Sequence, residues 1–218
     1  MHLMAESRTE NDQLLQLAAA GDGAAWGRLL TEHQDRLRRT VEFRLDRRLQ
    51  GRVDASDILQ EAYLQATAHR SEYFRNPSAP LFLWLRGVVA NKLLEVHRHH
   101  LGTRMRDAAR ETSGHSPAAA PDATSAALID RLTGGATGPS TAAGRSEIRL
   151  RLQEALNSMD VIDREVLALR HFEQLTNGEA AQVLGIQERA AAKRYVRALR
   201  RLKDLLAAMP GGLTEMRP

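Results

Sequence analysis

Apolar residues recur at three- and four-residue intervals along most of the chain, which is the spacing of one face of an α-helix. The clearest run covers residues 24–49, where the repeated positions are Trp26, Leu29, Leu30, His33, Leu37, Val41, Leu45 and Leu49. Sustained alternation of apolar and polar residues, which is the pattern of a half-buried strand, is nearly absent. The pattern therefore predicts an all-α protein.

Caps and breakers divide this pattern into separate helices. A short helix is expected over residues 10–20, and a long one over residues 24–49. A third helix opens at Asp54, where acidic residues in the first turn suit the helix dipole. Residues 71–80 contain two prolines and are predicted to form a loop, and residues 81–100 form the fourth helix. Four such helices are enough to close one small core.

The composition changes at Gly102. Residues 102–146 are rich in Ala, Gly, Ser, Thr and Pro, and they carry only a weak apolar pattern over residues 122–132. Such a segment buries too little apolar surface to offset its ordering entropy, so a flexible linker is predicted. Residues 10–101 and 147–207 are then two small helical domains.

The second domain contains a candidate helix-turn-helix. Thr176 and Glu179 have the spacing of a capping box, which starts a helix. Gly185 suits the left-handed position that ends this helix. Gln187 or Glu188 then begins a second helix.

The second helix is expected to be basic and amphipathic. At 100° per residue, one arc holds Ala192, Tyr195, Val196, Leu199, Leu202 and Leu206. The cations fall almost entirely on the opposite arc: Arg189, Lys193, Arg194, Arg197, Arg200 and Arg201. Such a helix fits the DNA major groove. A solvated basic face, a membrane surface or a protein partner are the alternatives.

Total charge adds little to this picture, whereas the distribution of charge matters. The 218 residues carry a formal net charge of only +4, but residues 189–203 hold seven Lys or Arg and no Asp or Glu. There is no cysteine, which excludes disulfides and thiolate metal sites. The N-terminal residues lack the apolar core of a signal peptide, and residues 79–85 form the longest apolar run. A cytoplasmic protein without a membrane segment is expected.

Candidate chemistry is sparse. His97 and His100 lie one turn apart, but neither cysteine nor a further nearby carboxylate completes a metal site, so a basic helix end is the preferred interpretation. The sequence motifs of serine hydrolases, zinc proteases and phosphate-binding loops are missing. We therefore expect neither catalysis nor a cofactor.

Two polar constellations remain. Asp57, Gln60 and Glu61 share one helix surface, which fits a docking face but also the wet side of a capped helix. Between residues 72 and 100, aromatic side chains alternate with cations and amides, as unstacked bases require; they are Tyr73, Phe74, Phe82, Trp84, Arg75, Arg86, Asn76 and Asn91. Phe82 fits the core better, and Trp84 lies at the border of the apolar stripe.

Three stretches together resemble the extracytoplasmic-function (ECF) sigma factors of bacterial RNA polymerase, of the sigma-70 class. DASDILQEAYLQA at residues 54–66 is similar to region 2.2 of that family. PLFLWLRGVVANKLLEVHRHH at residues 80–100 is similar to regions 2.3 and 2.4. Residues 157–202, from NSMDVIDREVL to RALRRL, are similar to region 4. The resemblance implies that residues 10–101 are region 2 and residues 147–207 are region 4.

The resemblance also implies partners and roles. Asp57, Gln60 and Glu61 match the surface that docks on the β′ clamp of core RNA polymerase, and region 4 would meet the β flap. The surface that opens the −10 element matches Tyr73, Phe74, Arg75, Asn76, Trp84, Arg86, Asn91 and Lys92. The reader of the −35 element matches Gln187, Glu188, Arg189, Lys193, Arg194 and Arg197. The linker matches the segment that threads the RNA exit channel, and an anti-sigma factor is compatible as a further partner.

One stretch departs from the family. Residues 187–194, QERAAAKR, replace a commoner series with Thr, Val, Lys and Ser before the arginine, so the promoter sequence does not follow from the resemblance. The alternative function is a stand-alone helix-turn-helix regulator, which would bind symmetric half-sites as a dimer.

Overall fold

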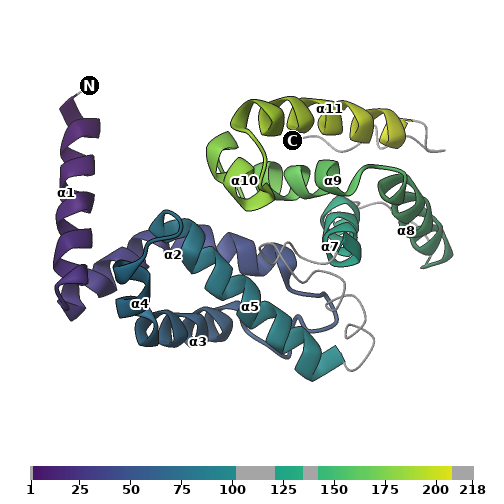
Figure 1. Ribbon diagram of the computed structural model, residues 1–218. Helices are drawn as coiled ribbons and strands as arrows, with labels where there is room; N and C mark the ends of the chain where they lie inside the picture. The colour runs from purple at the N-terminus through teal and green to yellow at the C-terminus, as the bar shows by residue number, and fades with distance from the viewer. Residues whose placement is uncertain (1, 102–120, 135–141, 208–218) are drawn as a thin grey trace.

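The computed structural model describes residues 2–101, 121–134 and 142–207, and its elements are helical throughout (Figure 1). The all-α prediction is thus confirmed. The elements in chain order are α1 (His2–Ala19), α2 (Gly23–Arg44), α3 (Ala55–Ala68), α4 (Arg70–Arg75), α5 (Leu81–Leu101), α7 (Pro121–Gly134), α8 (Ala142–Asn157), α9 (Val161–Leu167), the π-helical turn η2 (Ala168–Phe172), α10 (Asn177–Leu184) and α11 (Glu188–Ala207).

Helices α1 to α5 form the N-terminal half. Helix α2 packs against α1, α3 and α5, and α3 packs against α5. Local sequence sets the helix starts, because Asp22 accepts hydrogen bonds from the first turn of α2 and Asp54 does so for α3. The core between these helices is apolar and fully buried around Leu29, Leu37 and Leu85.

Helix α2 ends earlier than the apolar pattern predicts. The chain leaves the helix after Arg44, and Leu45 is extended. The reason is local: the Asp46 carboxylate accepts a hydrogen bond from the backbone N–H of Arg48 at 2.8 Å, which competes with helix continuation. Leu45 and Leu49 are buried all the same, in the turn that follows.

Helices α7 to α11, with η2, form the C-terminal half. The predicted helix-turn-helix is present as α10 and α11. Both hydrogen bonds of the capping box between Thr176 and Glu179 form, and Gly185 ends α10 with φ of 65°. Two helices lie where loops were expected. Helix α4 occupies part of residues 71–80, and α7 lies inside the predicted linker, packed against α8, α9 and α2.

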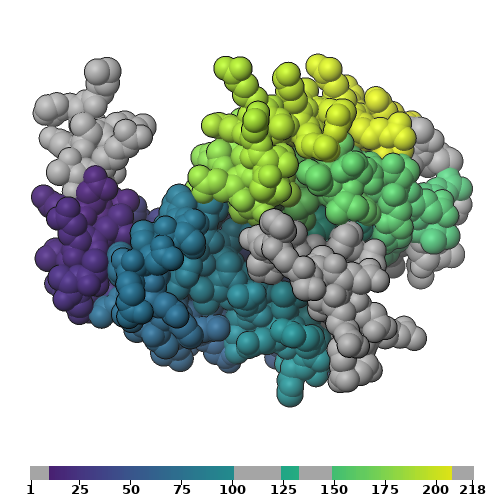
Figure 2. Space-filling model, in the orientation of Figure 1, coloured from purple at the N-terminus to yellow at the C-terminus, as the bar shows by residue number. Residues whose placement is uncertain are grey.

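The two halves pack directly against each other (Figure 2). Leu169, Leu175 and Ala180 of the C-terminal half belong to the core cluster of the N-terminal half. In the opposite direction, Phe43 of α2 belongs to the core cluster of the C-terminal half. Each core is thus completed by residues from the other half.

Candidate functional site

Helix α3 carries an acidic strip on its solvent side. Asp57, Gln60 and Glu61 are all exposed, while Ile58 and Leu59 between them are buried. The fold therefore brings the three predicted docking residues onto one open surface. The Lys92 Nζ atom of α5 lies 2.6 Å from the Glu61 carboxylate, so this member of the predicted −10 set borders the strip.

Leu64 extends the strip and was missed in the sequence. Its side chain is 73% exposed, the highest value among the exposed large apolar residues. It lies three positions after Glu61, so both side chains lie on the same helix surface. Leu64 lies off the apolar stripe of α3, and this position was the signal in the sequence that its side chain is exposed. Singly exposed apolar residues are common on protein surfaces, so Leu64 gains its interest only from its place beside the predicted docking residues.

The aromatic residues after α3 pack against one another and against Trp26 of α2. The Tyr73 ring centroid lies 4.8 Å from that of Trp84, and Phe74 meets Trp26 edge-on at 6.1 Å. Tyr73 is buried, and its hydroxyl donates a hydrogen bond to the Ala79 carbonyl at 3.1 Å. Burial also raises the pKa of the Tyr73 hydroxyl. In this state Tyr73 is therefore a core residue and not an open stacking platform.

The rim of this cluster is polar and accessible. Arg75 and Asn76 are exposed, and Phe74 and Trp84 are half-buried. Asn91 is also exposed, and it lies seven residues after Trp84 on α5, which places both on the same side of the helix. These residues are therefore accessible from solvent at the edge of the aromatic cluster.

Arg86 does not lie on this surface in the structure, although the sequence groups it with the −10 set. It follows Trp84 by two residues on α5 and therefore points to nearly the opposite side of the helix. Its side chain is 5% exposed and donates to the Glu173 carboxylate, with Nε at 2.8 Å and Nη2 at 3.1 Å. Arg86 is thus held at the junction between the two halves.

Glu173 is the centre of a buried ionic network at this junction, the Glu173 network. Besides Arg86, it accepts hydrogen bonds from Arg44 Nε at 2.6 Å and from the Thr40 hydroxyl at 3.0 Å. Arg44 also donates to Glu165 at 2.5 Å. Nothing in the local sequence around Glu173 indicates this role.

The surroundings of Glu173 lower the pKa of its carboxyl group strongly. Burial alone raises a carboxyl pKa, but the charges of Arg44 and Arg86 outweigh it and lower the pKa of Glu173 to about 2. Because the folded pKa is lowered, the stabilisation is complete above the unfolded pKa and is lost as the pH falls toward the folded value.

We therefore expect the free energy of unfolding to decrease as the pH is lowered from about 4.5 to about 2. Each pKa unit corresponds to about 1.4 kcal/mol. Urea denaturation of the wild type and of Glu173→Gln across this range provides the measurement, and the variant should show the shallower slope. Equal slopes would show that Glu173 does not titrate as the network requires.

Helix α11 lies along the outer edge of the molecule (Figures 1 and 2), and most of its cations are exposed. The exposed members of the predicted −35 set are Gln187, Glu188, Arg189, Lys193 and Arg197. Arg200 and Arg201 of the basic arc are exposed as well. Arg194 is partly buried instead, because it turns toward α9 and donates to Asp163 at 2.7 Å. The helix therefore offers a basic face that the N-terminal half leaves open.

Asp163 of α9 also holds Arg197. The Arg197 guanidinium makes a two-pronged contact with the Asp163 carboxylate, with its Nη2 atom 2.9 Å from one carboxylate oxygen, although the arginine side chain is 62% exposed. Burial raises the pKa of Asp163, but the hydrogen bonds from Arg197 and Arg194 outweigh it and lower this pKa. The carboxylate therefore stays ionised and holds the guanidinium groups of both arginines.

Val196 lies on the outer face of α11, contrary to the arc expected from the sequence. Its side chain is 47% exposed, whereas the buried face is formed by Ala191, Ala198 and Leu202. A shallow hollow of about 550 Å³ surrounds it, lined by Ala192, Lys193, Val196, Arg197 and Arg200. An apolar floor with a basic rim combines the two kinds of contact that major-groove reading uses.

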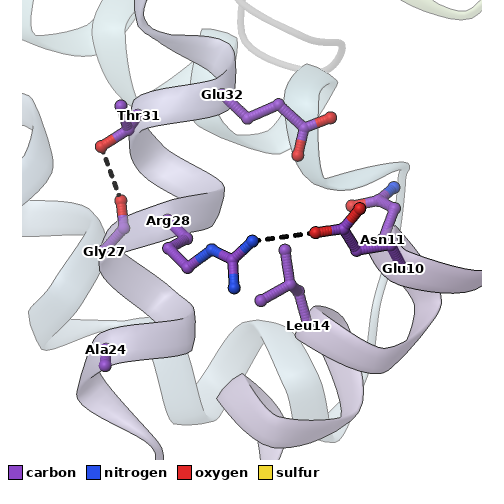
Figure 3. Close-up of a pocket in the computed structure, with 8 residues that line it drawn as sticks. All are labelled: Glu10, Asn11, Leu14, Ala24, Gly27, Arg28, Thr31 and Glu32. Carbon is purple, nitrogen blue, oxygen red and sulfur yellow. Dashed lines mark hydrogen bonds and ion pairs between the residues drawn. The ribbon is translucent and has the colours of Figure 1, made fainter. Parts of the chain in front are cut away.

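A second hollow, of about 610 Å³, lies in the seam between α1 and α2 (Figure 3). Its lining residues are Glu10, Asn11, Leu14, Ala24, Gly27, Arg28, Thr31 and Glu32. Arg28 bridges to Glu10 across the seam at 2.9 Å, with both side chains exposed. This contact is typical of a surface joint between helices, and we assign no function to the hollow.

His97 has a structural partner in place of a metal. The residue is buried, and its Nε2 atom accepts the backbone N–H of Asp46 at 3.2 Å. Burial lowers its pKa. Over the described ranges, no three His, Cys, Asp or Glu side chains are grouped as a metal site would require. In the same ranges, no helix has both the length and the apolar character to cross a bilayer.

Comparison with known proteins places these surfaces in a family. Residues 149–202 match the family model "Sigma-70, region 4"; the match covers the second half of α8, then α9, η2 and α10, and most of α11. The RNA polymerase sigma factor NccH of Alcaligenes xylosoxydans xylosoxydans is 27% identical over 90% of this chain and 94% of its own. The ECF RNA polymerase sigma factor SigD of Mycobacterium bovis is 28% identical over 90% of this chain and 84% of its own. Together these matches support an ECF sigma factor of the sigma-70 class.

The fold of this sigma factor agrees with that assignment. The structure of CnrH in complex with the cytosolic domain of CnrY superposes with a TM-score of 0.51. It covers 92% of this chain and 99% of CnrH, at 22% sequence identity. Sigma factors are initiation factors and not enzymes, and promoter-specific initiation of transcription is the function of this one.

Proposed function

We propose that this sigma factor docks on core RNA polymerase through α3. The acidic strip of Asp57, Gln60 and Glu61, with Leu64 beside it, supports this proposal because it combines open carboxylates with an exposed apolar side chain. The partner surface is the β′ clamp, and region 4, residues 147–207, would reach the β flap. The cytoplasm is the compartment in which this assembly would form.

The −10 element would be opened by the rim of the aromatic cluster. Trp84, Phe74, Arg75, Asn76 and Asn91 supply stacking surface, charge and amide groups beside one another. Lys92 flanks them from the same helix. Base stacking on an aromatic ring contributes about 1–3 kcal/mol, which offsets the cost of unstacking a base pair step at about 1.4 kcal/mol. Tyr73 supports this rim from the core.

The −35 element would be read by α11 in the major groove of duplex DNA. Lys193, Arg197 and Arg200 are suited to phosphates and guanine edges, and Val196 with Ala192 to a thymine methyl group. Gln187, Glu188 and Arg189 at the helix start face the same groove. Arg194 positions the helix through Asp163.

The observation that carries this proposal is the separation of two open surfaces. In Figure 1 the basic helix α11 runs along one edge of the molecule, and α3 lies at the opposite edge. A protein with this arrangement can hold DNA and a protein partner together. Gel filtration with core polymerase tests it, because a sigma factor co-elutes with the enzyme, whereas a stand-alone dimeric regulator elutes alone and binds symmetric DNA.

Replacing Arg197 with alanine is expected to weaken binding of the full chain to a mixed-sequence DNA duplex. Because one phosphate contact is lost, the slope of log affinity against log salt should become shallower by about one. Fluorescence anisotropy between low and moderate salt measures both effects. Arg48→Ala is the matched control, since Arg48 is an exposed arginine of the N-terminal half. An unchanged slope would remove Arg197 from the phosphate contacts.

A protein regulator is a further partner that we propose. CnrH was solved in complex with the cytosolic domain of CnrY, and its fold covers nearly all of this chain. An anti-sigma factor is the corresponding class of partner here. Such a protein should form a stable complex with the purified sigma factor and prevent its co-elution with core polymerase.

A further inference from the structure

We propose that Asp163 of α9 decides how selectively one base pair of the −35 element is read, because it holds the Arg197 guanidinium with one edge turned toward a guanine. Asp163 lies outside α11, and no motif of the sequence assigns a role to it. The inference rests on the proposed reading of the −35 element by α11. It deepens that proposal from a basic helix to one positioned base contact.

The Arg197 guanidinium is held by Asp163 along one edge. Its Nε atom donates to one carboxylate oxygen at 3.1 Å. Its Nη2 atom lies 2.9 Å from the other oxygen and 3.0 Å from the first. Among the described residues, every hydrogen bond of this guanidinium goes to Asp163. A two-pronged contact of this kind fixes the plane of the guanidinium as well as its position.

The end edge of the same guanidinium is open. All N–H groups of an arginine side chain lie in one plane, and the Nη1 and Nη2 atoms present two parallel donors at its end. The Asp163 contact uses the Nε side and leaves this end free, and the Arg197 side chain is 62% exposed. Guanine offers the two acceptors O6 and N7 to such a pair of donors in the major groove. The held arginine is therefore shaped for a guanine.

The other exposed cations of α11 are not held in this way. Arg189, Lys193, Arg200 and Arg201 make no hydrogen bond or ion pair with any residue that the structure describes. Flexible cationic side chains suit the phosphate backbone, which carries no sequence information directly. Arg197 differs from them because it is fixed before DNA arrives, and a preorganised side chain loses less conformational entropy on binding.

Asp163 is itself placed firmly enough to act as a support. It lies in the first turn of α9, whose start is capped by Asp160, and its side chain is 10% exposed. The partly buried Arg194 donates to the same carboxylate at 2.7 Å. One carboxylate thus ties two positions of α11 that lie on the same side of that helix. Asp163 therefore sets the rotation of α11 together with the orientation of Arg197.

The surroundings of Arg197 also favour a base contact. It lines the shallow hollow on α11 together with Val196 and Ala192. Apolar side chains of this kind contact thymine methyl groups at base edges. On a duplex of mixed sequence, where a guanine is seldom at the required place, the same guanidinium edge meets a phosphate instead. This is the contact that the salt dependence of Arg197→Ala measures.

Nuclear magnetic resonance tests the hold without DNA. The Nε–H signal of Arg197 in the full chain is the one that is missing from Arg197→Lys. It should exchange slowly with water in the unsubstituted protein, because the proton is shared with the Asp163 carboxylate. In Asp163→Asn the exchange should become at least tenfold faster. Fast exchange in the unsubstituted protein, or slow exchange in Asp163→Asn, would overturn the hold.

Selection from a randomised promoter tests the reading. A promoter found by mapping RNA 5′ ends supplies the DNA, its −35 element is randomised, and fragments bound by core RNA polymerase with the full-length sigma factor are sequenced. The unsubstituted protein should prefer a G·C pair at one position, and Arg197→Lys should lose this preference. Lysine keeps the charge but lacks the two parallel donors, so affinity for mixed-sequence duplex should stay within about twofold.

Asp163→Asn should reduce the preference for the same G·C pair about tenfold, which is within the discrimination that one bidentate arginine contact supplies. The other positions of the element should keep their preferences. Affinity for mixed-sequence duplex should not fall, because the substitution removes a negative charge. Asp160→Asn is the matched control, since it removes a negative charge from the same helix start and keeps a good N-cap residue. It should leave the selected element unchanged.

The double variant separates positioning from a merely structural role. If Asp163 acts through Arg197, Asp163→Asn should cause no further loss of preference in the Arg197→Lys background. A similar loss at every position of the element, a further loss in the double variant, or a preference that survives Asp163→Asn would overturn the inference. If the unsubstituted protein with core polymerase selects no upstream element, the proposed function fails and the reading by Arg197 fails with it. The exchange of the Nε–H proton still decides whether Asp163 holds Arg197.

Discussion

Replacing Gln60 and Glu61 together with alanine is expected to weaken binding to core RNA polymerase at least thirtyfold. Both side chains are exposed on α3, so their removal should not disturb the fold. The expected loss is that of hot-spot side chains at the centre of an interface, whose truncation costs 2 kcal/mol or more, which corresponds to about thirtyfold in affinity. Biolayer interferometry with immobilised core polymerase measures the change.

The chain offers a matched control for this double substitution. Gln153 and Glu154 are the same residue pair on α8, away from α3. Their replacement with alanine should leave polymerase affinity unchanged. Duplex DNA binding should be unchanged in both double variants, because neither touches α11. Retention of full polymerase affinity by the α3 variant would show that the acidic strip is only a solvated helix face.

Trp26→Ala is expected to lower the free energy of unfolding by about 3–5 kcal/mol, the range for large buried aromatics. Trp26 is 3% exposed, packs on Phe74 and Trp84, and donates its indole N–H to the Thr67 hydroxyl at 2.9 Å. The substitution leaves a cavity under the predicted −10 surface. Urea denaturation followed by circular dichroism gives the stability, and the midpoint should fall without loss of native helix content in buffer.

Leu64→Ala serves as the control, because it should leave stability nearly unchanged and should lower polymerase affinity. Its side chain is exposed, so the expected change in stability is within about 0.5 kcal/mol. Polymerase affinity should fall because the substitution removes apolar surface beside the acidic strip. If Trp26→Ala were no more destabilising than Leu64→Ala, the aromatic cluster would not be the support of the −10 surface.

The local features of the fold were predictable from the sequence. A capping box depends on two residues three positions apart, and the end of α10 depends on one glycine, so Thr176, Glu179 and Gly185 indicate their own structure. The same holds for α5, whose observed bounds Leu81–Leu101 differ by one residue from those predicted. Such features involve neighbours within one or two helical turns.

Features that depend on distant residues were not predictable. Arg86 and Glu173 are 87 positions apart, and neither residue type indicates a buried partner. The pattern in α7 is short and surrounded by Gly and Pro, so its packing against α8 and α9 became evident only in the fold. Burial of Arg86 explains why one member of the predicted −10 set faces the C-terminal half.

Two exposed apolar residues show the limit of periodicity. The sequence places Val196 on the apolar arc of α11, but the buried side of the helix is centred nearer Ala191 and Ala198. Small residues carry little weight in such a pattern, although they allow the closest helix contacts. From the sequence, Val196 is a core candidate and Leu64 has no assigned role. In the fold, both side chains lie on the surface.

The most direct measurement of the central claim is a map of RNA 5′ ends made in vitro. Core RNA polymerase is incubated with chromosomal DNA of the source organism, with and without this sigma factor. With the sigma factor present, new 5′ ends should appear that share two upstream sequence elements near −35 and −10, and they should disappear with the Gln60/Glu61 double variant. An unchanged set of 5′ ends, with the protein bound to DNA by itself, would contradict the central claim.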